Sequence, residues 1–459
     1  MTAFRLSPLV LALGLAACSL APTYERPAAP VAASYPAGAS AAGAAAAALA
    51  WRDFFTDARL QTLIATALEQ NRDLRTAALR IEEARALYRI QRADQIPNLS
   101  ASADMQRGRT PQMLSASGAS TVGKRYDAGL AVPAFELDFF GRVRSLSEAA
   151  LATYLASEEA RKAAQISLVA EVARAWYTER AYAEQLALAT RSFEARSKTY
   201  ALVQRRLEVG ASSRLELRQQ ETLLEAARSA MLTLTRQRAQ AENALAVLVG
   251  QPLPAAGSAP VQDVLPALAA GLPSDLLAQR PDILAAEQRL KAANANIGAA
   301  RAAFFPRISL TAALGSSSPS LDGLFDAGTR SWSFVPQLTQ PIFDAGRLSA
   351  NADLATVRKQ IAVADYEKTI QVAFREVADA LAARDTAGAQ LSSQEAARAA
   401  SAERLKLLQL RQTNGVASSL DILDAERELF SAEQAVVQAR LQRSGSAIDL
   451  YKALGGGLK

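Results

Sequence analysis

Apolar and polar residues alternate one by one over two stretches of this chain. The apolar positions are Leu99, Ala101, Ala103 and Met105 in the first stretch, and Ile308, Leu310, Ala312 and Leu314 in the second. A polar turn region and another alternating stretch follow each of them. A period of two is typical of β-strands that have one apolar face. The sequence therefore predicts two β-hairpins, at about 98–138 and 307–345.

Helical patterns occupy most of the remaining chain. Residues 142–209 contain neither Gly nor Pro, and the matching run 347–414 contains only Gly388. A helix of this length extends about 100 Å at 1.5 Å per residue. A shorter run follows each and carries apolar residues seven positions apart, at Leu217, Leu224 and Met231 and at Ile422, Leu429 and Val436. This spacing predicts coiled-coil packing of antiparallel helices that turn at Gly210 and Gly415.

The two halves of the chain repeat each other. Glu171-Val172-Ala173 matches Glu376-Val377-Ala378, and the long runs keep an offset of 205 positions over about 110 residues. Repeats of this kind stack on one another, so the 459 residues predict one elongated pseudo-symmetric unit. We infer a first repeat at 51–250, a connector at 251–281 and a second repeat at 282–459.

The hairpins are the candidate membrane segments. Beyond the N-terminus no run of 18 apolar residues predicts a transmembrane helix, so any span is made of β-strands. Open sheet edges are not tolerated in lipid, and four strands are too few to close a barrel. Two chains would supply eight strands around a filled interior, whereas three would supply twelve and leave a passage. The alternative is a small β cap on a soluble helical rod.

The N-terminus has the pattern of an export signal. Arg5 precedes an apolar run that ends at Leu15-Ala-Ala-Cys18, which resembles a bacterial lipobox. It predicts a signal peptide at 1–17 and, on Cys18, an N-acyl group such as palmitate and an S-diacylglycerol. The alternative is an ordinary signal peptide followed by an incidental cysteine. Residues 18–50, rich in Pro and then in Ala, Gly and Ser, predict a lipidated extended tether without a core of its own.

The amino-acid composition excludes several kinds of catalytic and binding site. Histidine is absent and cysteine occurs once, which excludes His-based acid–base catalysis, a His metal site and an intrachain disulfide. No Walker-type loop or recognisable pair of carboxylates is present, so we expect no enzyme activity, no cofactor and no metal. The net charge of +6 comes from dispersed Arg and Lys without a basic, aromatic-rich patch, so no nucleic acid is expected.

Several motifs together resemble one family. They are Leu15-Ala-Ala-Cys18, Trp51-Arg-Asp-Phe-Phe55, Arg280-Pro-Asp-Ile283, Ala302-Ala-Phe-Phe-Pro306, Leu420-Asp-Ile-Leu-Asp-Ala425 and Leu450-Tyr-Lys-Ala-Leu-Gly-Gly-Gly457. With the duplication, they resemble the OprM-type efflux lipoproteins of the TolC-like family. The resemblance implies a mainly α channel-tunnel: a homotrimer with a 12-stranded outer-membrane β-barrel continuous with a periplasmic α-barrel. It also implies a multidrug exit duct that works with a periplasmic adaptor and an inner-membrane RND transporter.

The resemblance also assigns site residues. Leu420, Asp424 and Arg427 would ring the closed periplasmic end of the channel, and their spacing of i, i+4 and i+7 places them on one helix face. The alternative for Asp424 is an exposed surface charge, and the nearby Asp421 leaves the charge balance open. The first repeat has Leu215, Gln219 and Thr222 at these positions.

The two helix turns are the second assigned site. Gly210 and Gly415 would close the long helices, and Ser213 and Ser418 would cap the next ones. By resemblance this tip also docks the adaptor.

Three functions are compatible with these features of the sequence. The leading hypothesis is a passive outer-membrane duct for drugs and other small molecules. An exit duct for secreted polypeptides or metal ions is an alternative, although a chain with four Met and no His lacks the clusters typical of metal export. A lipid-anchored coiled-coil rod is the third, and it would not conduct ions.

Overall fold

The computed structural model describes residues 19–35, 44–45, 49–116, 118–254, 265–269, 273–414 and 416–458. The predicted signal peptide, Cys18 and Gly415 lie outside these residues. The chain divides into two compact units. Of the described residues, those within 19–28, 80–158 and 285–367 form the strand unit, and those within 29–79, 159–284 and 368–458 form the helix unit. Each unit draws on both sequence repeats.

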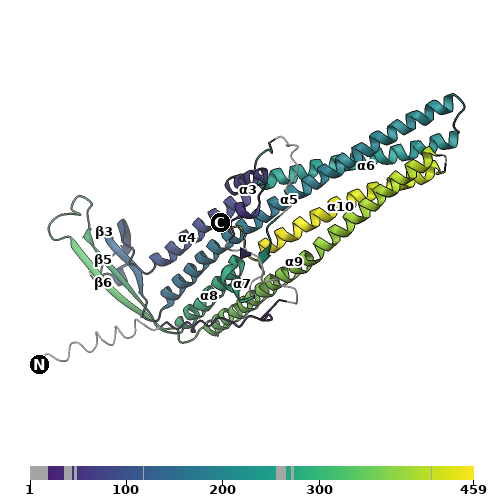
Figure 1. Cartoon of the computed structure of the whole chain (residues 1–459). Helices are drawn as coiled ribbons and strands as arrows, with labels where there is room; N and C mark the ends of the chain where they lie inside the picture. Colours follow the sequence, from purple (N-terminus) through teal and green to yellow (C-terminus); the bar gives the residue numbers. More distant parts are fainter. Residues whose placement is uncertain are drawn as a thin grey trace. The chain divides into compact units, whose positions relative to one another are not determined.

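The strand unit contains a four-stranded antiparallel sheet (Figure 1). Its strands are β2 (Ser100–Thr110), β3 (Thr121–Leu137), β5 (Arg307–Ser318) and β6 (Arg330–Thr339), in the order β2-β3-β5-β6. A single 3₁₀ turn, η1 (Gln112–Leu114), lies in the first hairpin. Both predicted hairpins are confirmed, and they join through β3 and β5, so β2 and β6 are the edges of the sheet.

One face of this sheet is apolar over four successive cross-strand rows. The cross-strand rows on that face are Leu130–Leu314–Trp332, Val132–Ala312–Phe334, Phe135–Leu310–Pro336 and Leu137–Ile308–Leu338. Between Val132 and Phe135 the strand β3 contains one extra residue, a β-bulge in which Ala134 has a φ of 41°. The bulge moves the apolar positions from even to odd numbers and so keeps them on the same face.

Nine helices of the described residues carry the rest of the fold. They are α2 (Trp51–Phe54), α3 (Ala58–Gln70), α4 (Arg72–Ala93), α5 (Arg142–Glu208), α6 (Arg214–Val249), α7 (Pro273–Gln279), α8 (Pro281–Ala302), α9 (Arg347–Thr413) and α10 (Ser419–Ala453). A short parallel pair links β1 (Ala44–Ala45) to β4 (Leu268–Ala269). None of the helices in the described ranges combines the length and the apolarity needed to cross a bilayer.

The helix unit is organised around two antiparallel helix hairpins, α5–α6 and α9–α10 (Figure 1). The predicted long runs became helices of 67 residues, α5 and α9. The heptad positions Leu224, Ile422 and Val436 are buried, as coiled-coil packing requires. Ala181 and Leu188 of α5 form a buried cluster with Val437 of α10, which joins the two hairpins.

The motifs at 51–55, 280–283 and 450–457 form one core in the helix unit. The ring of Tyr451 stacks on Phe54 at 4.1 Å, and its hydroxyl donates to the Leu49 carbonyl. A Cβ on Gly456 would lie 2.3 Å from the Tyr451 ring, so only glycine fits there. The buried Arg280 donates to the Ala453 carbonyl and pairs with Asp282 and Glu376. These motifs are therefore structural.

The N-terminal segment 19–28 lies against α8 in the strand unit. Glu287, whose side chain is 4% exposed, accepts hydrogen bonds from the Tyr24 hydroxyl and the Arg26 guanidinium and pairs with Lys291. Asn294 donates to the Pro22 carbonyl. The segment forms neither helix nor strand, but it is held to α8 by this cluster.

Candidate functional site

The α5–α6 turn forms one part of the predicted tip. Gly210 adopts a φ of 75°, and its amide donates to the Leu207 carbonyl at 3.0 Å. This left-handed conformation ends α5. Glycine suits the position because any residue with a side chain would be strained in this conformation. The Ser213 hydroxyl accepts a hydrogen bond from the Glu216 amide at 3.1 Å and caps α6. The predicted roles of Gly210 and Ser213 in the turn are therefore confirmed.

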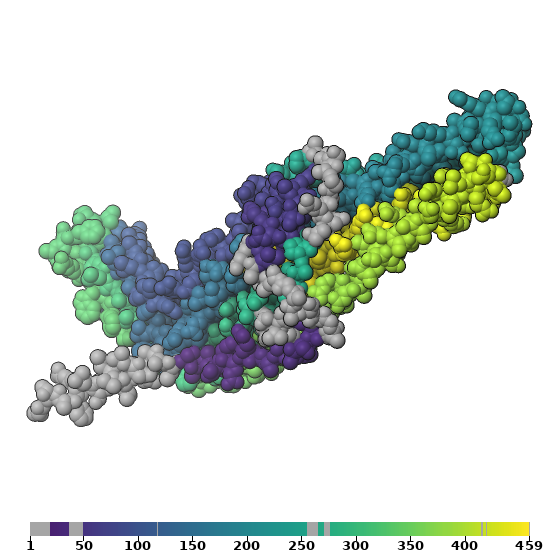
Figure 2. Space-filling model, in the orientation of Figure 1, coloured from purple at the N-terminus to yellow at the C-terminus, as the bar shows by residue number. Residues whose placement is uncertain are grey.

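The α9–α10 turn forms the other part. Ser418 and Asp421 make a reciprocal capping box: the Asp421 amide donates to the Ser418 hydroxyl at 3.2 Å, and the Ser418 amide donates to the Asp421 carboxylate at 3.0 Å. Hydrogen bonds from the Ser418 hydroxyl and amide lower the pKa of Asp421. Asp421 is thus a capping residue. Both turns lie exposed at the same end of the helix unit, with α6 in teal and α10 in yellow (Figure 2).

The residues predicted to form a gate lie within the first three turns of α10. The Arg427 guanidinium donates to the Asp424 carboxylate at 2.5 Å, whereas Leu420 is 73% exposed and contributes an apolar side chain. The Asp424 and Arg427 side chains are 47% and 75% exposed. The structure therefore brings Asp424 and Arg427 together as an ion pair on one helix face.

Two further charges, which our sequence analysis missed, extend this pair to α9. Arg404 lies 3.8 Å from the second Asp424 oxygen and forms an ion pair with Glu428. In an antiparallel hairpin that turns near residue 416, positions equally distant from the turn face each other, and 404 and 428 meet this condition. This rule could have found the pair from the sequence. The matching positions of the first repeat, Leu215, Gln219 and Thr222, carry no charge.

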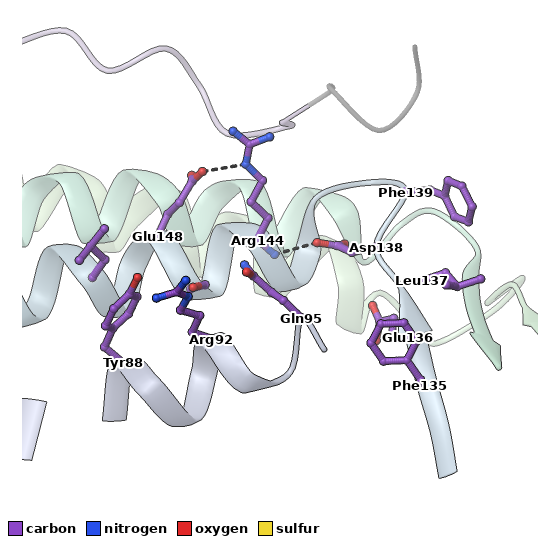
Figure 3. A pocket seen from close by; sticks show the side chains of 12 residues that line it. Tyr88, Arg92, Gln95, Phe135, Glu136, Leu137, Asp138, Phe139, Arg144 and Glu148 are labelled. Carbon is purple, nitrogen blue, oxygen red and sulfur yellow. Dashed lines mark hydrogen bonds and ion pairs between the residues drawn. The ribbon is translucent and has the colours of Figure 1, made fainter. Parts of the chain in front are cut away.

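A second candidate site is an open pocket of about 580 Å³ in the strand unit (Figure 3). The pocket is lined by Tyr88 and Arg92 of α4 with Gln95 of the turn that follows, by residues 135–139 at and just after the end of β3, and by Arg144, Ser147, Glu148 and Leu151 of α5. Arg144 joins the strand end to α5, because its amide donates to the Asp138 carboxylate at 2.7 Å. Its guanidinium pairs with Glu148 of the same helix at 2.9 Å. The sequence pattern did not indicate this pocket, because the pocket forms only where α4, the end of β3 and the start of α5 come together in the fold.

Neither site has the arrangement of a metal centre. Across the described ranges, no three His, Cys, Asp or Glu side chains are grouped so that they could hold a metal ion. Asp424 pairs with Arg427 at the tip, and Arg144 pairs with Glu148 in the pocket, so the chemistry of both sites is that of binding and electrostatics.

Comparison with known proteins gives consistent matches over nearly the whole chain. The family described as "Outer membrane efflux protein" matches residues 63–251 and 272–456. The chain is 51% identical to "Outer membrane protein OprJ" of Pseudomonas aeruginosa, over 99% of this chain and 96% of OprJ. It is 49% identical to "Antibiotic efflux pump outer membrane protein ArpC" of Pseudomonas putida, over 100% of this chain and 96% of ArpC.

A solved structure has the same fold. The open state of the MtrE outer membrane channel of Neisseria gonorrhoeae matches with a TM-score of 0.87 and 44% identity, over 96% of this chain and 99% of MtrE.

Proposed function

Because this chain belongs to the outer membrane efflux protein family, we propose that three copies assemble into the complete exit duct of an efflux pump. The chain is an outer-membrane efflux channel with a TolC-like fold. The observation that carries the association of copies is the sheet order β2-β3-β5-β6, which leaves β2 and β6 as edges with a neighbour on one side only among the described strands. Three copies are the smallest number that would leave a passage through the barrel. Unpaired backbone groups are not tolerated in lipid. Pairing β6 of one copy with β2 of the next closes a barrel of twelve strands.

The apolar face of the sheet faces the lipid in this assembly, and the opposite face lines the passage. That opposite face carries polar groups such as Arg125, which donates to both Asp127 and Ser317. The long helix hairpins of the three copies then continue the duct into the periplasm. The assembly also explains why a single chain has so many exposed apolar side chains: neighbouring copies and lipid would cover them.

We propose that the periplasmic end is closed by Leu420, Asp424 and Arg427. Three copies of the Asp424–Arg427 pair would narrow the pore with alternating charges, and three Leu420 side chains would add an apolar ring. The contacts of Arg404 with Asp424 and Glu428 support this assignment, because they tie the proposed gate to α9. Opening then requires α10 to move relative to α9.

The tip is proposed to dock a periplasmic adaptor, which connects the duct to an inner-membrane transporter of the RND class. Gly210, Ser213 and Ser418 are exposed residues of the two turns, whereas Gly415, which we also propose as part of the docking site, lies outside the described residues. The caps of Ser213 and Ser418 give two rigid helix ends for a partner to contact. The duct itself needs no catalysis, so the energy for transport comes from that transporter.

Antibiotics and other small molecules are the proposed cargo. The relative ArpC is described as part of an antibiotic efflux pump, and it aligns with the whole length of this chain. Secreted polypeptides or metal ions are the alternative cargo, and no structural feature of the described residues favours them. We also propose that Cys18 carries the N-acyl and S-diacylglycerol groups and anchors the chain to the outer-membrane lipid.

The assembly is tested with the full chain purified in detergent. Sedimentation should show a trimer, and the same material should form ion-conducting pores in a planar bilayer. A monodisperse folded monomer or dimer would overturn the architecture. A trimer that never conducts would favour the structural-rod alternative.

A further inference from the structure

We propose that the pocket between α4, the end of β3 and the start of α5 binds the headgroup of a membrane phospholipid that carries both a phosphate and an ammonium group, as phosphatidylethanolamine does. Nothing in the channel function requires such a site. Three independent features of the pocket indicate it: its place on the sheet, its charges and its form.

The pocket lies where the lipid-facing side of the sheet ends. Phe135 and Leu137, which line it, belong to the apolar face, in the rows Phe135–Leu310–Pro336 and Leu137–Ile308–Leu338. The bulge at Ala134 is what places these two side chains on that face. Aromatic side chains at the boundary of an apolar band mark the membrane–water interface in β-barrels. Lipid headgroups lie at this level, beside the pocket.

The charges of the pocket match a headgroup with both signs. Arg92 on α4 has no ion pair or hydrogen bond among the described residues, so its guanidinium is available for a phosphate. Asp138 and Glu148 line the pocket from the strand end and from α5. The side chains of Arg144 and Glu148 are 54% and 44% exposed, so the ion pair between them is weak. Glu148 can therefore also accept a contact from an ammonium group.

The form of the pocket suits a headgroup whose acyl chains remain in the bilayer. Its volume of about 580 Å³ falls within the range of small-ligand sites, roughly 300–1,000 Å³. Figure 3 shows Arg92 extending from α4, Asp138 from the strand end and Glu148 from α5, with Phe135 and Leu137 on the strand. The phosphate would contact Arg92, the ammonium group would contact Glu148 or Asp138, and the acyl chains would follow the apolar face of the sheet.

The experiment measures lipid retention by the full chain, delipidated in detergent, in native mass spectra after addition of phosphatidylethanolamine or phosphatidylglycerol with the same acyl chains. Arg92→Glu should weaken phosphatidylethanolamine binding about tenfold, since it replaces a charge-assisted contact by repulsion. Arg89→Glu is the matched control, because it makes the same change one turn earlier on α4, outside the pocket. It should leave binding unchanged.

A second variant tests the ammonium half of the proposal. Glu148→Gln should weaken phosphatidylethanolamine binding and strengthen phosphatidylglycerol binding, because it removes the partner of the ammonium group and frees Arg144. The oligomer mass in each spectrum reports whether the variant is folded. Equal effects of Arg92→Glu and Arg89→Glu would overturn the site. A wild-type protein that prefers phosphatidylglycerol, with Glu148→Gln unchanged, would overturn the headgroup assignment.

Discussion

At the scale of single residues, Asp424 is the proposed gate residue with two charged partners among the described residues. It is bound to Arg427 on its own helix and lies 3.8 Å from Arg404 on α9. An exposed ion pair contributes only about 0–1 kcal/mol, but three symmetry copies in a narrow pore would strengthen each other. The matched position in the first repeat, Gln219, has no such partners.

Asp424→Ala should therefore loosen the periplasmic end of the channel. Without the carboxylate, Arg427 and Arg404 repel each other and their symmetry copies, which favours movement of α10 away from α9. We expect a higher single-channel conductance in planar bilayers, and cells that become sensitive to a large antibiotic that the outer membrane normally excludes. Gln219→Ala is the control and should change conductance much less. Equal and negligible effects at both positions would place the constriction elsewhere.

Glu287 is a second residue whose charge has a structural consequence. Burial alone would raise its pKa, but hydrogen bonds and charge from Arg26 and Lys291 outweigh this and hold the pKa below its ordinary value of 4.5. A carboxylate with a lowered pKa stabilises the folded state above its ordinary pKa, and this stabilisation is lost as the pH falls through the lowered value.

We predict that the segment 19–28 detaches from α8 when Glu287 is neutralised. Hydrogen exchange in this segment, corrected for intrinsic rates, should rise as the pH falls below 4.5 and should be high at neutral pH in Glu287→Gln. Glu25→Gln is the control, because Glu25 is an exposed residue of the same segment. If Glu287→Gln exchanges like the wild type at neutral pH, other contacts hold the segment.

At the scale of elements, the capping box at the start of α10 predicts a local effect. Ser418→Ala removes a cap that is worth about 1 kcal/mol, so the first turn of α10 should open about fivefold more often. Hydrogen exchange of the amides at 420–422 measures this opening. Ser431→Ala, an exposed serine within the same helix, should have no effect there. Unchanged exchange in Ser418→Ala would mean that packing alone holds this helix end.

Elements were more predictable from the sequence than contacts between them. The alternation at 99–106 and 307–314 located the hairpins, and the runs bounded by Gly210 and Gly250 gave the ends of α5 and α6 within a few residues, because these signals are local. The bulge at Ala134 was missed, since it appears only when β3 is paired with β5. The attachment of Arg26 to Glu287 joins residues 261 positions apart, and no local pattern reports it.

At the scale of the whole molecule, duplication accounts for the assembly. Each repeat supplies one strand hairpin and one helix hairpin, and neither can bury its apolar faces alone. The two strand hairpins meet at β3 and β5, and the two helix hairpins meet through α5 and α10. The edges β2 and β6 remain open for neighbouring copies. Anchorage in the membrane should then depend on the strands of all copies more than on any single lipid group.

Cys18→Ser, exported with the signal peptide of a secreted protein, should lose all acyl labelling and still be found mostly in the outer-membrane fraction. A single acyl chain gives only marginal, reversible membrane binding, whereas the strands of a trimer bury a wide apolar band in the bilayer. Ser19→Ala is the control and should keep both the acyl label and the location. Complete release of Cys18→Ser from membranes would contradict the assignment of membrane strands at 98–138 and 307–345.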